Sequence, residues 1–207
     1  MMLMSRFRPN YCRALVIVHG ASEFQIASYI KRNLRLPMEI IGKDNGKHNI
    51  QINGLKDYLK KQFPTQKVFL DKANAKVENK KIADIKVFTI MDTDDCAPPS
   101  LCKKYKDKSL FNGIWLQPYI FPIYNSPSLE HILYKAKIID KMLSDDEKMR
   151  EYRRIFPLDK KNSGQGGLDE IEAFCKKISD VKNTNLNEFV DFCIKWAISM
   201  RVKNVNQ

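Results

Sequence analysis

Two short apolar runs limit the fold more than any other feature, because neither alternates regularly with polar residues. They occupy residues 13–18 (RALVIV) and 86–91 (KVFTIM). A strand with one exposed face alternates apolar and polar residues, whereas a strand buried on both faces does not. In parallel sheets, helices bury both faces. The chain is therefore predicted to adopt an α/β fold with an open, mostly parallel sheet flanked by helices.

The segments up to residue 140 predict helices that alternate with strands, as such a sheet requires. Residues 22–34 show helical spacing, with Ser22 as the predicted N-cap. Ser126 is predicted to cap the helix that follows residue 125, with Pro127 at its first position. Residues 65–85 fit either a short strand or a short helix, together with a lysine-rich loop. The other predicted elements are a strand at 38–42, helices at 50–63 and 98–111, and an edge or irregular strand at 114–124 that holds two prolines.

From Ser144 onward the pattern is helical, without heptads or internal repeats. The predicted helices cover residues 144–156, 168–180 and 185–202. The glycine-rich segment 161–167 (KNSGQGG) is typical of a flexible linker. We therefore expect an α/β domain over residues 13–140 and a helical C-terminal extension over residues 141–207 that packs on it.

The net charge favours a polyanionic partner. The 207 residues carry a formal charge of +12, and the lysines are spread along the chain. A solvated lysine-rich surface explains part of this charge, but such a field also attracts nucleic acid and speeds its encounter. DNA or RNA is therefore the partner that we expect.

The apolar runs and the cysteines bear on the compartment. No apolar run reaches the ~18 residues that a membrane-spanning helix needs, and the first residues do not resemble a signal peptide. We therefore expect a cytoplasmic protein with no membrane contact. The five cysteines are odd in number and form no C-x-x-C pair. Free thiols are expected, rather than disulfides or structural zinc.

The segment FTIMDTDDC (residues 88–96) puts three carboxylates directly after a predicted buried strand. Ligands of an open parallel sheet bind beyond the carboxyl ends of its strands, where the strand order reverses. That rule brings Asp92 and Asp94 close to Glu23, which follows the first strand. Closely spaced carboxylates suit Mg²⁺ or Mn²⁺, which could activate water for attack on a phosphate. The alternative is that Asp94 and Asp95 only cap a turn.

Three motifs, in order, resemble Toprim-type domains and, within them, the RloB-like proteins of restriction and phage-defence loci. That family has C-E-G-x-x-T-E after one strand, D-x-D-D after another, and S-N-P-x-F-E at the start of a later helix. This chain has VHGASE at residues 18–23, MDTDD at residues 91–95 and YNSPSLE at residues 124–130. The resemblance covers residues 13–140.

The resemblance implies a metal-dependent nuclease of anti-phage defence by abortive infection, working beside an ATPase partner protein. It also implies that Asp92, Asp94, Glu23 and Glu130 hold Mg²⁺ or Mn²⁺ and that Glu23 is catalytic. His19 stands where the family has its first Glu, and it brings no negative charge. Either His19 is a replacement base in a site that favours Mn²⁺, or the site is impaired and the fold serves nucleic-acid binding or sensing.

Two further segments have alternative interpretations. Lys43, Lys47 and His48 in residues 42–49 (GKDNGKHN) could bind phosphate, or this segment is a plain turn, since its spacing is not that of a P-loop. The aromatic residues of 115–124 could stack on bases, although such residues more often pack in a core. A protein-interaction module, whose acidic residues contact a basic partner, remains an alternative to both nucleic-acid functions.

Overall fold

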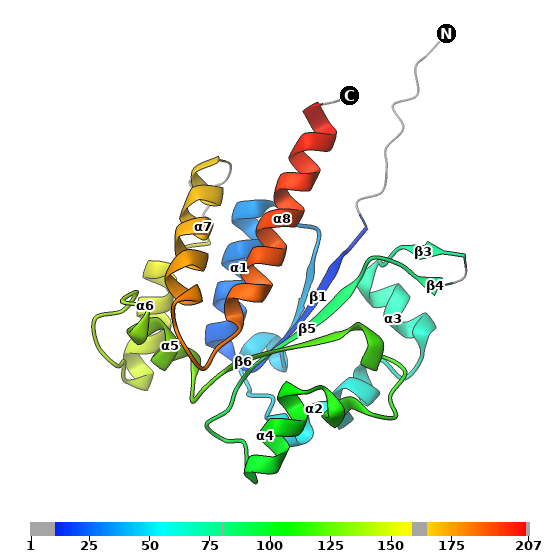
Figure 1. The fold of residues 1–207 in the computed structure, drawn as a ribbon, viewed down its shortest axis with the longest axis horizontal. Coiled ribbons are helices and arrows are strands. Elements are labelled where there is room, and N and C mark those ends of the chain that lie inside the picture. Colours follow the sequence, from blue (N-terminus) through cyan, green and yellow to red (C-terminus); the bar gives the residue numbers. More distant parts are fainter. Residues whose placement is uncertain (1–10, 80, 159–164, 206–207) are drawn as a thin grey trace.

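The computed structural model describes residues 11–79, 81–158 and 165–205. Within them, the fold is centred on a four-stranded parallel sheet with the order β2-β1-β5-β6, flanked by helices (Figure 1). The predicted α/β class, with an open parallel sheet and a C-terminal helical region, is confirmed. The strands are β1 Ala14–Val18, β2 Glu39–Ile41, β5 Lys86–Asp92 and β6 Ile120–Asn125, with a small antiparallel pair of β3 Val77–Glu78 and β4 Lys81–Ile82.

The central strands are buried on both faces, which explains why their sequences do not alternate. In β1, Val16 packs into one hydrophobic core and Leu15 into the other, because successive strand residues point to opposite faces. The first core contains α1 Ala21–Leu34, α5 Leu129–Lys135, α6 Asp145–Ile155, α7 Gln165–Ser179 and α8 Leu186–Val205. The second core contains α2 Ile52–Gln62, α3 Gln66–Ala73 and α4 Pro99–Lys106.

The C-terminal helices share a continuous core with the sheet. Phe88 of β5 contacts Phe189 and Phe192 of α8, with ring centroids 5.1 Å and 5.2 Å away. Tyr152 of α6 is buried in the same cluster, against Phe156. In Figure 1, α7 and α8 stand beside α1 on one side of the sheet.

The strand β6 forms one edge of the sheet, as its prolines predicted. Pro122 has no N–H to offer, and Tyr124 donates its backbone N–H to Oδ1 of Asn185 at 2.8 Å. Asn185 in turn donates to the carbonyl of Pro122 at 3.0 Å. The segment between α7 and α8 therefore covers part of an otherwise unpaired edge. The predicted strand at 114–124 begins too early, because Gln117–Tyr119 forms a 3-10 helix that contains Pro118.

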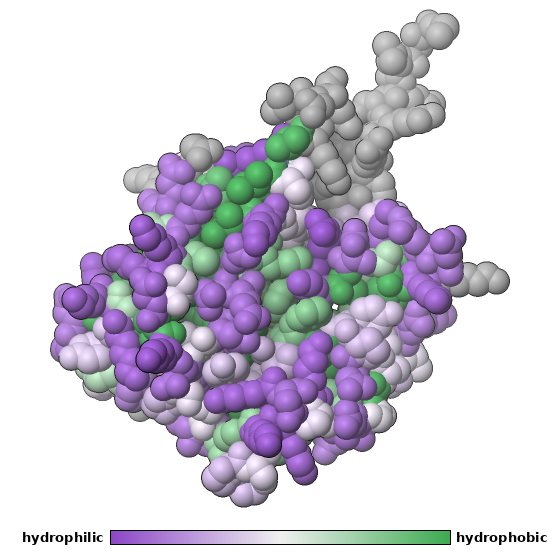
Figure 2. Space-filling model, in the orientation of Figure 1, coloured by the Kyte–Doolittle hydropathy of each residue, from purple (hydrophilic) through white to green (hydrophobic). Residues whose placement is uncertain are grey.

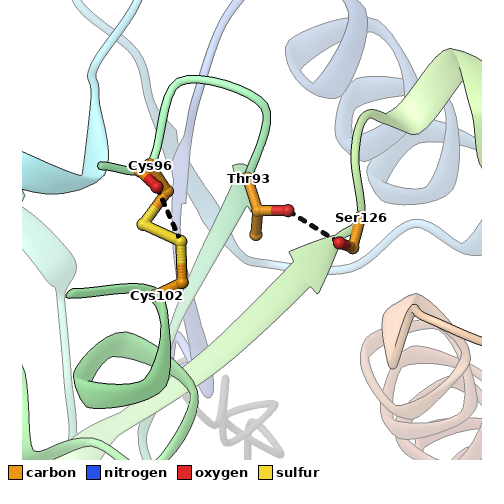
Figure 3. The surroundings of a disulfide bond; sticks show 4 residues. All are labelled: Thr93, Cys96, Cys102 and Ser126. Carbon is orange, nitrogen blue, oxygen red and sulfur yellow. Dashed lines mark hydrogen bonds between the residues drawn. A yellow bond between two sulfur atoms is a disulfide. The ribbon is translucent and has the colours of Figure 1, made fainter. Parts of the chain in front are cut away.

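Two predicted helix caps are wrong. Gly20, not Ser22, is the N-cap of α1. Ser128, not Ser126, is the N-cap of α5, and its hydroxyl accepts the His131 N–H. Ser126 instead accepts a hydrogen bond from Thr93 at 2.9 Å (Figure 3).

Two further segments were predicted as ambiguous in structure and as a linker, respectively. Residues 65–85 contain α3 and the β3–β4 hairpin, so both a helix and strands form there. Of the predicted linker at 161–167, residues 161–164 lie outside the described residues, and α7 already begins at Gln165.

The expectation of free thiols is wrong for one pair of cysteines. Cys96 and Cys102 form a disulfide, shown in Figure 3, while Cys12, Cys175 and Cys193 are free. The chain turns between β5 and α4 and brings the Cα atoms of the pair to 5.7 Å, within the range that a disulfide spans. A separation of six residues does not reveal that turn.

Among the described helices, none is both long and apolar enough to cross a bilayer.

Candidate metal centre

A cavity of about 460 Å³ lies where the strand order reverses, between the carboxyl ends of β1 and β5. The turn from β1 into α1 forms one wall, and the end of β5 and the start of α5 form another. Side chains of α6 complete the lining. The polar side chains of the lining are His19, Ser22, Glu23, Asn49, Asp92, Asp94, Ser128, Glu130, His131, Lys148 and Tyr152.

Glu23 lies in the first turn of α1 and is 3% exposed. Its Oε2 accepts the backbone N–H of Gly20 at 2.9 Å, so the carboxylate also serves the start of the helix. Burial raises the pKa of Glu23 from 4.5 to about 7, and the nearby charge of Asp94 adds to the shift. Near neutral pH, this carboxyl group can therefore both give and accept a proton.

Asp92 ends β5, and it points into the cavity. Its Oδ1 accepts the backbone N–H of Leu129 at 2.9 Å and the side-chain amide of Asn125 at 3.2 Å. Burial raises the pKa of Asp92 well above its usual value, and repulsion from the Glu23 carboxylate raises it further. The two turns that the sequence predicted to converge therefore supply acids to one cavity, close enough to repel each other.

The other two acids of the cluster differ in their surroundings. Asp94 is exposed and lines the cavity. Asp95 is half-buried, and burial raises its pKa, against the nearby charge of His19. Within the described part of the chain, Oδ1 of Asp95 is buried without a hydrogen-bond partner. Such an oxygen is costly unless something else binds it.

His19 is fixed by the strand-like segment that follows the 42–49 turn. Its backbone carbonyl accepts the Ile50 N–H at 2.8 Å, and its Nδ1 lies 3.1 Å from the Ile50 carbonyl oxygen. Because a carbonyl only accepts, Nδ1 must carry the proton of this bond. In the neutral ring, Nε2 then keeps its lone pair for a proton or a metal ion. Metal-binding histidines are commonly oriented by such a bond from the other nitrogen.

Glu130 lines the cavity, but its oxygens have protein partners. Oε1 accepts the backbone N–H of Leu143, and Oε2 lies 3.3 Å from Nζ of Lys148 on α6. These contacts tie the segment before α6, and α6 itself, to the start of α5. Glu130 therefore stabilises one wall of the cavity, and holding a metal would require it to release at least one of these partners.

The predicted phosphate-binding residues do not line the cavity. Lys43, Lys47 and His48 lie in the turn around the 3-10 helix Asp44–Gly46, and Nε2 of His48 pairs with Asp44 at 3.3 Å on the surface. The turn nevertheless packs closely on the start of α1. A Cβ added at Gly46 would lie only 3.2 Å from the Gly20 carbonyl oxygen.

Sequence reasoning missed four residues of the site. Asn49, Lys148 and Tyr152 line the cavity, and Asn125 donates a hydrogen bond to Asp92. Only Asn125 had a local signal, since a polar residue at the end of an apolar strand points to the same rim as Asp92. The positions of the other three depend on how distant segments pack.

The donor chemistry of the cavity fits a hard divalent cation. Glu23 and Asp92 repel each other, and such an ion would neutralise carboxylates that face the cavity. The arrangement is open, since no three His, Cys, Asp or Glu side chains of the described residues form a compact metal-binding group. An ion would therefore be bound by few protein ligands, as Mg²⁺ commonly is when it keeps several waters.

Comparisons with known proteins found no family model, no curated protein and no solved structure that matches this chain. The resemblance to Toprim-type domains therefore stays a prediction from the three sequence motifs.

Proposed function

We propose that this chain is a metal-dependent phosphodiesterase of the Toprim type that cleaves DNA or RNA. The observation that supports this most is the pair of buried carboxylates, Glu23 and Asp92. They come from separate turns and face one cavity, and repulsion from the Glu23 carboxylate raises the pKa of Asp92 beyond the effect of burial. Unless a ligand compensates such a pair, it costs stability. A cation bound there, with a phosphate beside it, would compensate the repulsion between the two carboxylates.

In this proposal Asp92 and Asp94 would hold Mg²⁺ or Mn²⁺, and water molecules would complete the coordination. When bound, the ion would stabilise negative charge on the phosphate and favour deprotonation of a water molecule. Glu23, with a pKa of about 7, can exchange a proton with the reacting groups near neutral pH. His19 can accept a proton at Nε2, while Nδ1 stays bonded to Ile50.

A second candidate function is a nucleic-acid-binding or sensor subunit that has lost cleavage. The open spacing of the acids favours it, as do the contacts that already engage Glu130. Neutral His19 in place of an acid favours it as well. A role in anti-phage defence beside an ATPase partner rests on the motif resemblance alone.

Cleavage of labelled single-stranded and duplex DNA and RNA, titrated with Mg²⁺ and Mn²⁺, tests the proposal. We expect metal-dependent cleavage by the wild type that falls at least about a hundredfold in Asp92→Asn and Glu23→Gln. Asp71→Asn, which removes an exposed acid of α3, is the matched control and should keep full activity. Equal activity in the Asp92→Asn variant would overturn the proposed site. Metal-independent binding without cleavage would favour the second candidate.

A further inference from the structure

Three lysines gather on aromatic rings along the outer edge of the sheet, away from the metal-centre residues. Nζ of Lys86 lies 4.5 Å from the Phe121 ring centroid, and Nζ of Lys108 lies 4.3 Å from the same ring. Nζ of Lys106 lies 4.2 Å from the Tyr124 ring centroid. We call these residues, together with Phe192 of α8, the β6 edge surface.

The aromatic rings of this surface are partly buried and pack against the two hydrophobic cores. Phe121 contacts Phe88 of the core at 5.8 Å, and Phe192 contacts the same ring at 5.2 Å. Lys86 lies over both Phe121 and Phe192, the latter at 4.8 Å. All three aromatic residues of the surface are partly exposed. Each ring therefore contacts the core and lies beside at least one ammonium group, and its exposed part is within reach of a ligand.

The ammonium groups of these three lysines have no counter-ion within the part of the chain that the structure describes. Among the described residues, no carboxylate forms an ion pair with Lys86, Lys106 or Lys108. Two of them share the Phe121 ring although they repel each other, and burial and this repulsion lower the pKa of Lys108. An anion bound between them would relieve the repulsion. A chain with a net charge of +12 would attract polyanions to such a place.

We propose that the β6 edge surface binds single-stranded nucleic acid, with phosphates on the lysines and bases on the outer sides of the aromatic rings. Lysines beside partly exposed rings are the combination that single strands require, because unpaired bases offer their faces for stacking. A duplex offers phosphates but keeps its base faces hidden. In Figure 2, hydrophilic and apolar residues intermix over the face of the molecule that carries β6.

The position of this surface relates it to the candidate metal centre. Phe121 and Tyr124 are three residues apart on β6, and Tyr124 directly precedes Asn125, which bonds to Asp92. Phe121 packs on one core and Tyr124 on the other, because residues three apart on a strand point to opposite faces, so the surface wraps around the edge of the sheet. The further step, that the bound strand is also the substrate, rests on the proposed function. Together the two proposals make single-stranded nucleic acid the preferred substrate. Binding itself needs no metal, so it can fail or succeed independently of cleavage.

Fluorescence anisotropy tests the proposal on the full chain with a labelled oligonucleotide of about 12 nucleotides, as DNA and as RNA, in EDTA. We expect Lys86→Gln/Lys108→Gln to weaken single-strand binding about tenfold or more and to reduce the slope of log K against log salt by about 1.4, which is ~0.7 for each lost phosphate contact. Phe121→Leu keeps an apolar contact with Phe88 and should weaken single-strand binding at least about fivefold through lost stacking. Whether DNA or RNA binds more tightly identifies the preferred strand.

The control is Lys176→Gln/Lys177→Gln, which removes the same charge from exposed positions at the end of α7. It should change binding by less than about twofold, since it removes only long-range attraction. Far-UV circular dichroism checks that each variant folds, and Tyr124→Leu replaces Phe121→Leu if the latter does not. Equal losses in the two lysine pairs would overturn the proposal. So would a ring substitution that weakens duplex binding as much as single-strand binding.

Discussion

The side-chain Nδ2 of Asn125 donates a hydrogen bond to Oδ1 of Asp92 at 3.2 Å, and the Thr184 hydroxyl donates to the side-chain Oδ1 of Asn125 at 3.0 Å. Asn125 is fully buried at the end of β6. It therefore couples an acid of the candidate metal centre to the connection between α7 and α8. The orientation of Asp92 depends on a part of the chain that the three motifs do not include.

The variant Asn125→Leu tests this coupling, because it keeps the volume and removes both hydrogen bonds. We expect the free energy of unfolding to fall by about 2 kcal/mol, since buried polar groups lose their partners. Asp92 would also lose an orienting contact, so the rise in melting temperature on adding Mn²⁺ should shrink. The control Asn33→Leu removes a buried hydrogen bond within α1 and should lower stability without changing the Mn²⁺ response. An unchanged Mn²⁺ response in Asn125→Leu would contradict the coupling.

Stability in metal-free solution should depend on pH through Glu23. Its pKa is about 7 in the folded protein and 4.5 as an ordinary side chain, so the folded state binds the proton more tightly. The stabilisation is therefore complete below pH 4.5 and is lost as pH rises through about 7. The full loss amounts to about 3 kcal/mol by linkage, and Asp92 changes in the same direction.

Urea unfolding between pH 4.5 and 8 in EDTA measures this dependence. We expect Glu23→Gln to flatten it and to be the more stable protein at pH 8, because Gln still accepts the Gly20 N–H without a charge. Added Mn²⁺ should flatten the wild-type dependence as well, since the ion stabilises the ionised carboxylates. If the free energy of unfolding of the wild type rose between pH 4.5 and 7, the raised pKa values of Glu23 and Asp92 would be contradicted.

The fold was predictable from local sequence because burial on both faces leaves a direct mark on each central strand. Residues 13–18 lack polar alternation, and β1 is indeed enclosed by helices on both sides. The convergence of Glu23 and Asp92 was equally predictable, since both follow the carboxyl ends of strands beside the switch point. No contact between the two turns had to be known for that inference.

The rest of the site depends on tertiary packing that no local pattern contains. Lys148 and Tyr152 reach the cavity because α6 packs against α1, and an amphipathic helix does not specify its partner. The caps were missed for a similar reason. Ser126 and Ser128 are equally good capping residues in the sequence, and the contact between Ser126 and Thr93 decides between them.

Variants of His19 separate its structural contact from its chemistry. His19→Asn can still donate from Nδ2 to the Ile50 carbonyl, near the position of Nδ1, but it has no group at Nε2. We expect its melting temperature to stay close to that of the wild type and cleavage to fall about a hundredfold, the usual loss when a general base is removed. Full cleavage by His19→Asn would exclude His19 as a base. His19→Glu supplies the acid of the Toprim pattern and should lower metal-free stability while increasing the Mg²⁺ response.

Gly20 and Asn49 should be energetically coupled, because a side chain at position 20 would displace the Asn49 side chain from its present position. A Cβ at Gly20 would lie 2.6 Å from Oδ1 of Asn49, a distance that forces movement. The backbone of Gly20 is extended, so Gly20→Ala is not strained by its own conformation. Oδ1 is the end of an exposed side chain that can move aside, so we expect this variant to lose at most about 1 kcal/mol and to recover the loss when combined with Asn49→Ala. Chemical denaturation of the wild type, both single variants and the double variant gives the coupling energy. If the double variant were no more stable than Gly20→Ala, the close approach of Asn49 to the start of α1 would not be what excludes a side chain at position 20.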